Sequence, residues 1–215
     1  MFYQDSQHIY RVPELDALPW LMHGFGTRLS DIPGRFAQLA TLKQIHSSRC
    51  VAAGGREGQL GQGDAILEDA PGAVIAVKTA DCLPLLLADE RHRAVAAVHA
   101  GWRGTAAEIV RHAIAAMHDR FGTQAEDLHA AIGPGIGPCC YEVGPEVAAQ
   151  FGLFGRVPLD LPAINRRQLE GAGVLAERIY DSGLCTMCRP AEFHSFRRDR
   201  EAAGRMHSFI GIAPV

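Results

Sequence analysis

Three short apolar segments in the middle of the chain place the strongest limit on its fold. They are Ala73–Thr79, Leu83–Ala88 and Ala94–Val98, and most of their consecutive positions are apolar. A strand that is apolar on both faces must be covered on both faces. The sequence therefore predicts a buried sheet at the centre of the protein.

Two helices and two further strands are expected after the three central segments. The segment Thr105–Phe121 has an apolar stripe at helical spacing, and Gly122 is placed to end the helix. A second helix is expected over about Leu161–Tyr180, with Asp160 as its N-cap. Two more strands are predicted at Leu128–Ile132 and Met206–Ile212. The expected fold is α/β or α+β, with mixed sheets flanked by helices in a single catalytic domain over residues 1–215.

The charge and the hydropathy pattern argue against two classes of partner. The net charge is −3, so no basic surface is expected to neutralise nucleic-acid phosphates. The longest central apolar run, Leu83–Ala88, is too short to span a bilayer, and the first residues lack the pattern of a secretory signal. We expect a cytoplasmic protein, a monomer or small homo-oligomer, that binds neither nucleic acid nor membrane.

The six cysteines and ten histidines suggest metal binding or catalysis. Six cysteines in 215 residues are too sparse for a disulfide scaffold. Cys82 and His99 stand at the two ends of a segment that has the pattern of a β-hairpin. Its two apolar runs are separated by the polar residues Asp89–His92. If the turn is centred between Glu90 and Arg91, Cys82 lies directly opposite His99, with Cβ atoms about 4.5–5.5 Å apart.

A facing cysteine and histidine have three interpretations, which the spacing alone leaves open. They are zinc ligands, a nucleophile with its base, or packed core residues. The segment Gly101-Trp-Arg-Gly104 follows His99 directly. Its glycines permit unusual backbone angles, and the helix expected after it would offer free N–H groups to an anion such as phosphate.

Five motifs together resemble the YfiH family, whose members are also described as multicopper polyphenol oxidases or laccases and as purine nucleoside phosphorylases. The resemblance extends from about His23 to the C-terminus. The motifs are Gln44-Ile-His46, Thr79-Ala-Asp-Cys-Leu-Pro84, Val98-His-Ala-Gly-Trp-Arg-Gly104, Ile132-Gly-Pro-Gly-Ile-Gly-Pro-Cys-Cys-Tyr-Glu-Val-Gly144 and Phe193-His-Ser-Phe-Arg-Arg-Asp199.

The resemblance implies a catalytic zinc site and a set of activities. Zinc would be held by His46, Cys82 and His99, with a fourth position open to water or substrate. The implied activities are phosphorolysis of adenosine, inosine, guanosine and methylthioadenosine, and deamination of adenosine. The implied fold is a sandwich of mixed sheets flanked by helices, shared with a group of proteins regarded as cysteine hydrolases. Family members usually have a longer segment before the residues matching Gln44, so substrate contacts made by that segment are expected to be missing here.

Two rival enzymatic functions remain open, and a non-catalytic binding protein is the remaining class. The family's other name suggests a copper-dependent polyphenol oxidase, and blue-copper sites do use two histidines and a cysteine. A laccase, however, needs several coppers and many His-x-His pairs, and this chain has no such pair. The other rival is a metal-free cysteine hydrolase or cell-wall precursor editing enzyme, which would use Cys82 as nucleophile and His99 as base.

Several other polar residues are candidates for supporting roles. Arg103 and Arg197 are expected to contact phosphate or ribose, while Arg198 is as readily a structural ion-pair residue. Asp64 and Asp81 are candidates to orient a ligand or accept a proton. Four further cysteines, Cys139, Cys140, Cys185 and Cys188, have the residue types of a four-cysteine zinc site or a redox pair, and ordinary packing is the favoured interpretation for them.

Overall fold

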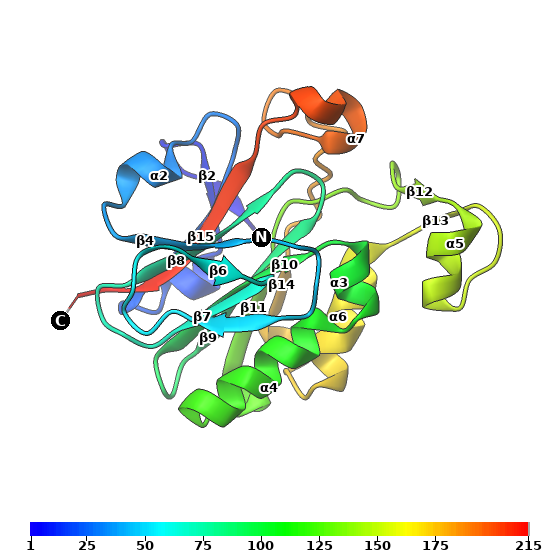
Figure 1. The fold of residues 1–215 in the computed structure, drawn as a ribbon. Helices are drawn as coiled ribbons and strands as arrows, with labels where there is room; N and C mark the ends of the chain where they lie inside the picture. Colours follow the sequence, from blue (N-terminus) through cyan, green and yellow to red (C-terminus); the bar gives the residue numbers. More distant parts are fainter. Residues whose placement is uncertain (215) are drawn as a thin grey trace.

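A computed structural model describes residues 1–214 and contains two large mixed sheets packed face to face (Figure 1). The seven-stranded sheet has the order β1-β2-β3-β15-β8-β4-β6, and the six-stranded sheet has the order β14-β11-β9-β10-β7-β5. Most neighbouring strands are antiparallel. The parallel pairs are β4 with β6, β4 with β8, β5 with β7, and β11 with β14. The expected fold class is confirmed.

The strands of the seven-stranded sheet are β1 (Tyr3–Gln4), β2 (Ile9–Arg11), β3 (Leu21–Gly26), β4 (Leu39–Lys43), β6 (Gly58–Gln62), β8 (Val74–Thr79) and β15 (Met206–Ile212). Those of the six-stranded sheet are β5 (Cys50–Ala52), β7 (Ala65–Glu68), β9 (Leu83–Asp89), β10 (Ala94–Ala100), β11 (Leu128–Ile132) and β14 (Ile179–Asp181). A small separate pair is formed by β12 (Glu142–Val143) and β13 (Val157–Pro158). All five strands expected from the sequence are present.

The helices are α1 (Pro13–Asp16), α2 (Ile32–Arg35), α3 (Trp102–Ala106), α4 (Ile109–Phe121), α5 (Pro145–Ala148), α6 (Leu161–Gly171) and α7 (Phe196–Asp199). Short 3-10 turns lie at Ala125–Asp127, Ala149–Phe151, Ala176–Arg178 and Arg200–Ala202. None of the helices within residues 1–214 has the length and apolar character needed to cross a membrane.

The central strands are apolar on both faces because each face has its own cover. In β9, Leu85 and Leu87 pack in a core shared with the helices α4 and α6, whereas Leu86 and Ala88 pack in the core between the two sheets. Figure 1 shows α4 and α6 together on the side of the six-stranded sheet that faces away from β8 and β15. Side chains on alternate positions therefore enter different cores.

Both expected helices are shorter than predicted. The first is broken into α3 and α4 at Glu108, whose φ of 53° is left-handed and ends the first segment. Asp160 does cap α6, accepting a hydrogen bond from the Ala163 N–H at 2.9 Å, but the helix ends at Gly171. Gly173, with φ of 99°, then turns the chain toward β14, so a loop, the 3-10 turn Ala176–Arg178 and the start of β14 occupy the rest of the expected helix.

Candidate metal centre and active site

Cys82 and His99 lie on the side of the six-stranded sheet that faces the other sheet. The register of the β9–β10 hairpin pairs His99 with Pro84, so the expected pairing of Cys82 with His99 is wrong by two residues. The turn takes up residues 90–93, and Arg93 has a left-handed φ of 52°. A shift of two residues keeps each side chain on its original face. Cys82, just before β9, therefore remains a diagonal neighbour of His99.

His46 reaches the same point from the loop between β4 and β5. Its backbone is left-handed, with φ of 59°, and its ring centroid lies 4.9 Å from that of His99 in an edge-on arrangement. One ligand atom from each of His46, Cys82 and His99 lies within 4.8 Å of the other two. His46 is exposed, Cys82 is partly exposed and His99 is buried. The three residues form a group that could hold a metal ion at the edge of the core.

Asp64 holds two of these residues in position. Its fully buried carboxylate accepts a hydrogen bond from the ring of His99, with Oδ1 at 2.9 Å from Nδ1. The same carboxylate accepts from the backbone N–H groups of Ile45, His46 and Ser47, and from the Ser47 hydroxyl. Burial acts to raise the pKa of Asp64, but the hydrogen bonds from His99 and Ser47 outweigh it and lower the pKa to about 2.

The electrostatics of the group favour a thiolate. Burial acts to raise the pKa of Cys82, but hydrogen bonds with His46 and His99 and their positive charge lower the pKa to about 6. Burial likewise acts to lower the pKa of His99, but Asp64 and Cys82 raise it to about 9. A thiolate is the form of cysteine that binds a metal or attacks a substrate. Since Asp64 takes Nδ1, the hydrogen bond between His99 and the Cys82 sulfur involves Nε2.

Glycine at position 101 is explained by the lack of room for a side chain and not by its backbone angles. Its φ is −77°, and neither it nor Gly104 is in the left-handed region, so the expectation of unusual angles is wrong. A Cβ added at Gly101 would lie 2.8 Å from the Sγ atom of Cys82 and 3.3 Å from Cδ2 of His46. A Cβ at Gly104 would lie 3.3 Å from the Ser47 carbonyl. The backbone of this turn closes directly on the cluster.

Asp81, the residue before Cys82, is hydrogen-bonded to the C-terminal segment of the chain. Its carboxylate accepts hydrogen bonds from the hydroxyls of Thr186 and Ser195, at 2.6 and 3.0 Å, and from the backbone N–H of Arg197 at 2.6 Å. Asp81 itself has a left-handed φ of 84°. No hydrogen bond joins the Asp81 carboxylate to the Cys82 thiol among the described residues, and the hydrogen bonds of Asp81 hold the surrounding loops.

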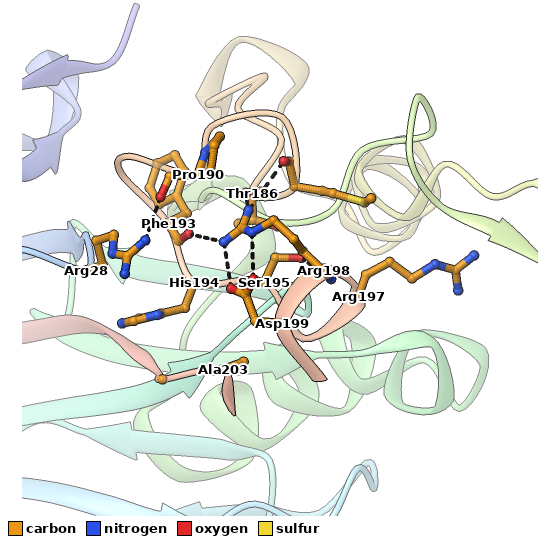
Figure 2. A network of polar contacts seen from close by, with 12 residues as sticks. Arg28, Thr186, Pro190, Phe193, His194, Ser195, Arg197, Arg198, Asp199 and Ala203 are labelled. Carbon is orange, nitrogen blue, oxygen red and sulfur yellow. Dashed lines mark hydrogen bonds and ion pairs between the residues drawn. The ribbon is translucent and has the colours of Figure 1, made fainter. Parts of the chain in front are cut away.

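The two neighbouring arginines of the C-terminal segment have different surroundings. Figure 2 shows the guanidinium of Arg198 enclosed in a network, in which it donates to the Phe193 carbonyl and pairs with Asp199 at 2.8 Å. Its other donors reach the carbonyls of Thr186 and Met187, so Arg198 is a structural residue. Arg197 extends away from this network and donates to the Glu142 carbonyl at 2.6 Å.

Tyr141 is a residue of the site that sequence reasoning did not single out. The guanidinium of Arg197 lies over its ring, at 5.9 Å from the centroid. Burial and the charge of Cys82 raise the pKa of Tyr141 to about 12, against the opposing charges of Arg197 and Arg103. Arg103 is exposed and stacks on Trp102, with 4.3 Å between the guanidinium carbon and the ring centroid. In the sequence, the only feature that indicates Tyr141 is its place within the Ile132–Gly144 motif.

A second group of possible metal ligands lies apart from the first in sequence. It consists of Cys139, Cys140, Cys185 and Cys188, whose sulfur atoms are all within 4.8 Å of one another. The structure therefore brings together the four cysteines for which ordinary packing is the favoured interpretation. Cys139 and Cys188 are exposed, and the other two are partly exposed.

Comparison with known proteins assigns the chain to a family. A family described as multi-copper polyphenol oxidoreductase laccase matches residues 27–213. A purine nucleoside phosphorylase of Deinococcus radiodurans is 43% identical over 183 residues, which span 80% of this chain and 70% of that protein. The purine nucleoside phosphorylase YlmD of Geobacillus stearothermophilus is 39% identical over 162 residues, which span 69% of this chain and 59% of YlmD.

The fold has matches among solved structures as well. The crystal structure of YlmD from Geobacillus stearothermophilus superposes with a TM-score of 0.89 and 28% identity, covering 99% of this chain and 98% of that one. The family match, the two sequence relatives and this shared fold agree with the motifs around His46, Cys82 and His99. The chain belongs to the YfiH family of multi-copper polyphenol oxidoreductase (laccase) proteins, which includes proteins named purine nucleoside phosphorylase.

Proposed function

We propose that the protein is a zinc-dependent purine nucleoside phosphorylase, acting on adenosine, inosine, guanosine and methylthioadenosine, and that the same site deaminates adenosine. The observation that carries the proposal is the convergence of His46, Cys82 and His99 within 4.8 Å, with one exposed member. The names of the relatives support phosphorolysis. Deamination, the choice of substrates and the choice of zinc are proposals for this chain, as is a cytoplasmic, single-domain enzyme.

The donor set fits zinc. One thiolate and two imidazoles are ligands that zinc prefers, and three protein ligands leave a position for water or substrate, as in catalytic zinc sites. The hydrogen bond from His99 to Asp64 is the outer contact that zinc-binding histidines usually make, because it fixes the ring orientation and the tautomer. When bound, zinc would supply Lewis-acid chemistry and activate water.

The protein residues then have separate tasks. Asp64 holds a proton of His99 on Nδ1 and so leaves Nε2 as the ring atom on the side of Cys82, where it would bind the ion. Gly101 leaves room for the thiolate of Cys82, since a Cβ at this position would lie 2.8 Å from the sulfur. In phosphorolysis a phosphate oxygen forms a bond to ribose C1′, the bond from C1′ to the purine breaks, and the purine nitrogen takes up a proton. In deamination water adds at purine C6 and ammonia leaves.

Arg103 and Arg197 are proposed to bind phosphate and ribose. Both charges act on Tyr141, as does Cys82, which supports a location of all four groups in one region. The helix that follows Gly101 is a single short segment, α3, so the proposed phosphate site depends on the Arg103 guanidinium rather than on a long helix dipole. Arg197 uses one donor on Glu142 and retains others for a ligand.

Adenosine turnover with and without phosphate, alongside metal analysis of the same preparation, tests the proposal. We expect adenine and ribose 1-phosphate only when phosphate is present, and inosine with ammonia when it is absent. Apo protein reloaded with zinc or with copper separates the two metals, and the zinc form should be the active one. Turnover of a phenolic substrate by the copper form, without nucleoside turnover by the zinc form, would contradict the proposal.

A metal-free cysteine hydrolase is the second candidate, and one observation favours it. Asp64, His99 and Cys82 form a chain of carboxylate, imidazole and low-pKa thiol, which is the order of an orienting acid, a base and a nucleophile. Alkylation of Cys82 by iodoacetamide separates the candidates. Zinc should protect the thiol if it is a ligand, whereas a metal-free nucleophile should react at the same rate with and without zinc.

A further inference from the structure

The four cysteines outside the centre described above come from two loops that meet in space. Cys139 and Cys140 end the Gly/Pro-rich loop that follows β11, and Cys185 and Cys188 lie in the loop between β14 and α7. Their sulfur atoms all lie within 4.8 Å of one another. This cysteine cluster therefore needs an explanation that ordinary packing does not supply, because two of its members are exposed.

The sulfur separations fit a shared ion better than a disulfide. The Sγ atoms of Cys139 and Cys188 are 3.6 Å apart, and those of Cys140 and Cys188 are 3.4 Å apart. A disulfide needs a separation of about 2.05 Å. Four sulfurs at about 2.3 Å from a tetrahedral zinc ion lie about 3.8 Å from one another. These two separations are closer to the second value than to the first, and the other sulfur pairs lie within 4.8 Å.

The backbone around the cluster is already arranged for such a site. The N–H of Gly137 points to the Sγ atom of Cys185 at 3.3 Å, a contact that stabilises a negatively charged sulfur. The two loops also exchange backbone hydrogen bonds, from Gly135 to the Leu184 carbonyl at 3.2 Å and from Thr186 to the Gly135 carbonyl at 2.9 Å. Backbone hydrogen bonds between the two loops therefore keep the four thiols close together.

The cluster is coupled to the loops around the candidate active site. Thr186, between Cys185 and Cys188, donates its hydroxyl proton to Asp81 at 2.6 Å, and Asp81 precedes Cys82. On the other loop, Cys140 precedes Tyr141, whose ring centroid lies 5.9 Å from the guanidinium of Arg197, and the backbone N–H of Arg197 donates to Asp81 at 2.6 Å. An ion in the cluster would fix both loops at once.

We propose that Cys139, Cys140, Cys185 and Cys188 form a second metal site, a four-thiolate structural zinc site that fixes these two loops beside the candidate active site. A closed set of four protein ligands is the pattern of structural rather than catalytic zinc. The thiols release their protons to solvent as the ion binds. This site is independent of the proposed phosphorylase function, and its failure would leave that proposal unaffected.

The test counts metal ions per chain in the full-length protein, prepared with reductant, exposed to Zn²⁺ and freed of loosely bound metal. The Cys82→Ala variant removes the first centre and should still bind zinc at one ion per chain. The double variant Cys82→Ala with Cys188→Ser should lose that ion. The matched control, Cys82→Ala with Cys50→Ser, changes a thiol outside the cluster and should retain it.

A second probe keeps the test informative if the double variant is unstable. Co²⁺ bound to the Cys82→Ala variant should give the intense thiolate-to-metal absorption of a four-sulfur site, and Zn²⁺ should raise its melting temperature. Absence of bound zinc in the Cys82→Ala variant would overturn the proposal. So would an absorption that the Cys188→Ser change leaves unaltered, or a disulfide in the cluster that forms equally with and without zinc.

Discussion

The Nδ1 atom of His99 lies 2.9 Å from the Oδ1 atom of Asp64, and this contact connects a potential metal ligand to a buried carboxylate. The same carboxylate receives backbone N–H groups from the loop that carries His46. One buried side chain therefore sets the position of both histidines of the candidate centre.

Asp64→Asn should weaken metal binding and destabilise the fold together. The amide would direct an NH₂ group at backbone donors, leaving buried groups without acceptors, so we expect a loss of about 1–3 kcal/mol in the free energy of unfolding. Zinc affinity should fall about ten- to a hundredfold because the outer contact of His99 is lost. Urea unfolding and competition with a chromogenic chelator measure the two effects.

Asp89→Asn is the matched control for Asp64. Asp89 is also fully buried, and its carboxylate accepts from the backbone of Arg91 and His92 at the far end of the β9–β10 hairpin. This variant should lose stability and keep its zinc affinity. An equal loss of affinity in both variants would mean that the effect of Asp64 is one of general stability.

Gly101→Ala should impair the centre by steric conflict. The added Cβ would lie 2.8 Å from the Cys82 sulfur, so the thiolate or the turn must move. We expect zinc content and nucleoside turnover to fall sharply, while the circular dichroism spectrum stays that of the native fold. Gly104→Ala is the control, since its added Cβ meets the Ser47 carbonyl at 3.3 Å and not the thiol. Greater loss of zinc from Gly104→Ala would contradict this account of the turn.

Arg103→Ala should separate phosphorolysis from deamination. Loss of one charge-assisted contact to phosphate is worth roughly 1.5–3 kcal/mol, or about ten- to a hundredfold in affinity. The apparent constant for phosphate should rise by that factor, while deamination, which uses water, should change much less. Arg120→Ala, an exposed change near the end of α4, controls for charge and should alter neither rate. Equal loss of both activities in Arg103→Ala would remove the phosphate assignment.

His23 should make the protein less stable in mild acid. Burial lowers the pKa of this histidine from 6.5 to about 4, although Asp16 acts to raise it, and its Nε2 accepts the Val12 N–H at 3.0 Å. Between about pH 6.5 and 4 the unfolded chain binds a proton at this position and the folded chain does not. The free energy of unfolding should therefore fall as the pH decreases through this window, by at most about 3 kcal/mol.

His23→Gln tests this assignment because it keeps an acceptor and removes the titration. Urea unfolding at several pH values should give a flatter dependence for the variant than for the native chain. The same slope in both proteins would place the acid sensitivity elsewhere in the molecule.

The central strands could be predicted because their periodicity is local and complete. Leu83–Ala88 is apolar at consecutive positions, and the structure buries both faces of β9. The hairpin register could not be predicted, since it depends on a turn that places Arg93 in a left-handed conformation. The predicted and observed registers differ by two residues, an even number, so the prediction that Cys82 and His99 share one face of the hairpin is correct.

Other parts of the site depend on contacts between distant segments. No spacing connects His46 with Cys82, and only the family motifs indicated that they would meet. The break between α3 and α4 arises at Glu108, a residue whose type gives no sign of a left-handed angle. The cysteine cluster likewise joins loops that are 45 or more positions apart, as the separation of Cys140 and Cys185 shows. Tertiary structure decides these features, and local sequence patterns do not encode them.

The most direct test of the central claim compares the native chain with Cys82→Ala in one set of assays. Zinc content, phosphate-dependent release of adenine and phosphate-independent release of ammonia from adenosine are measured on the same preparations. If His46, Cys82 and His99 hold one ion that supports both reactions, the variant loses the ion of this centre and both activities. Retention of either activity at the native rate would contradict the claim that a shared metal centre carries out the chemistry.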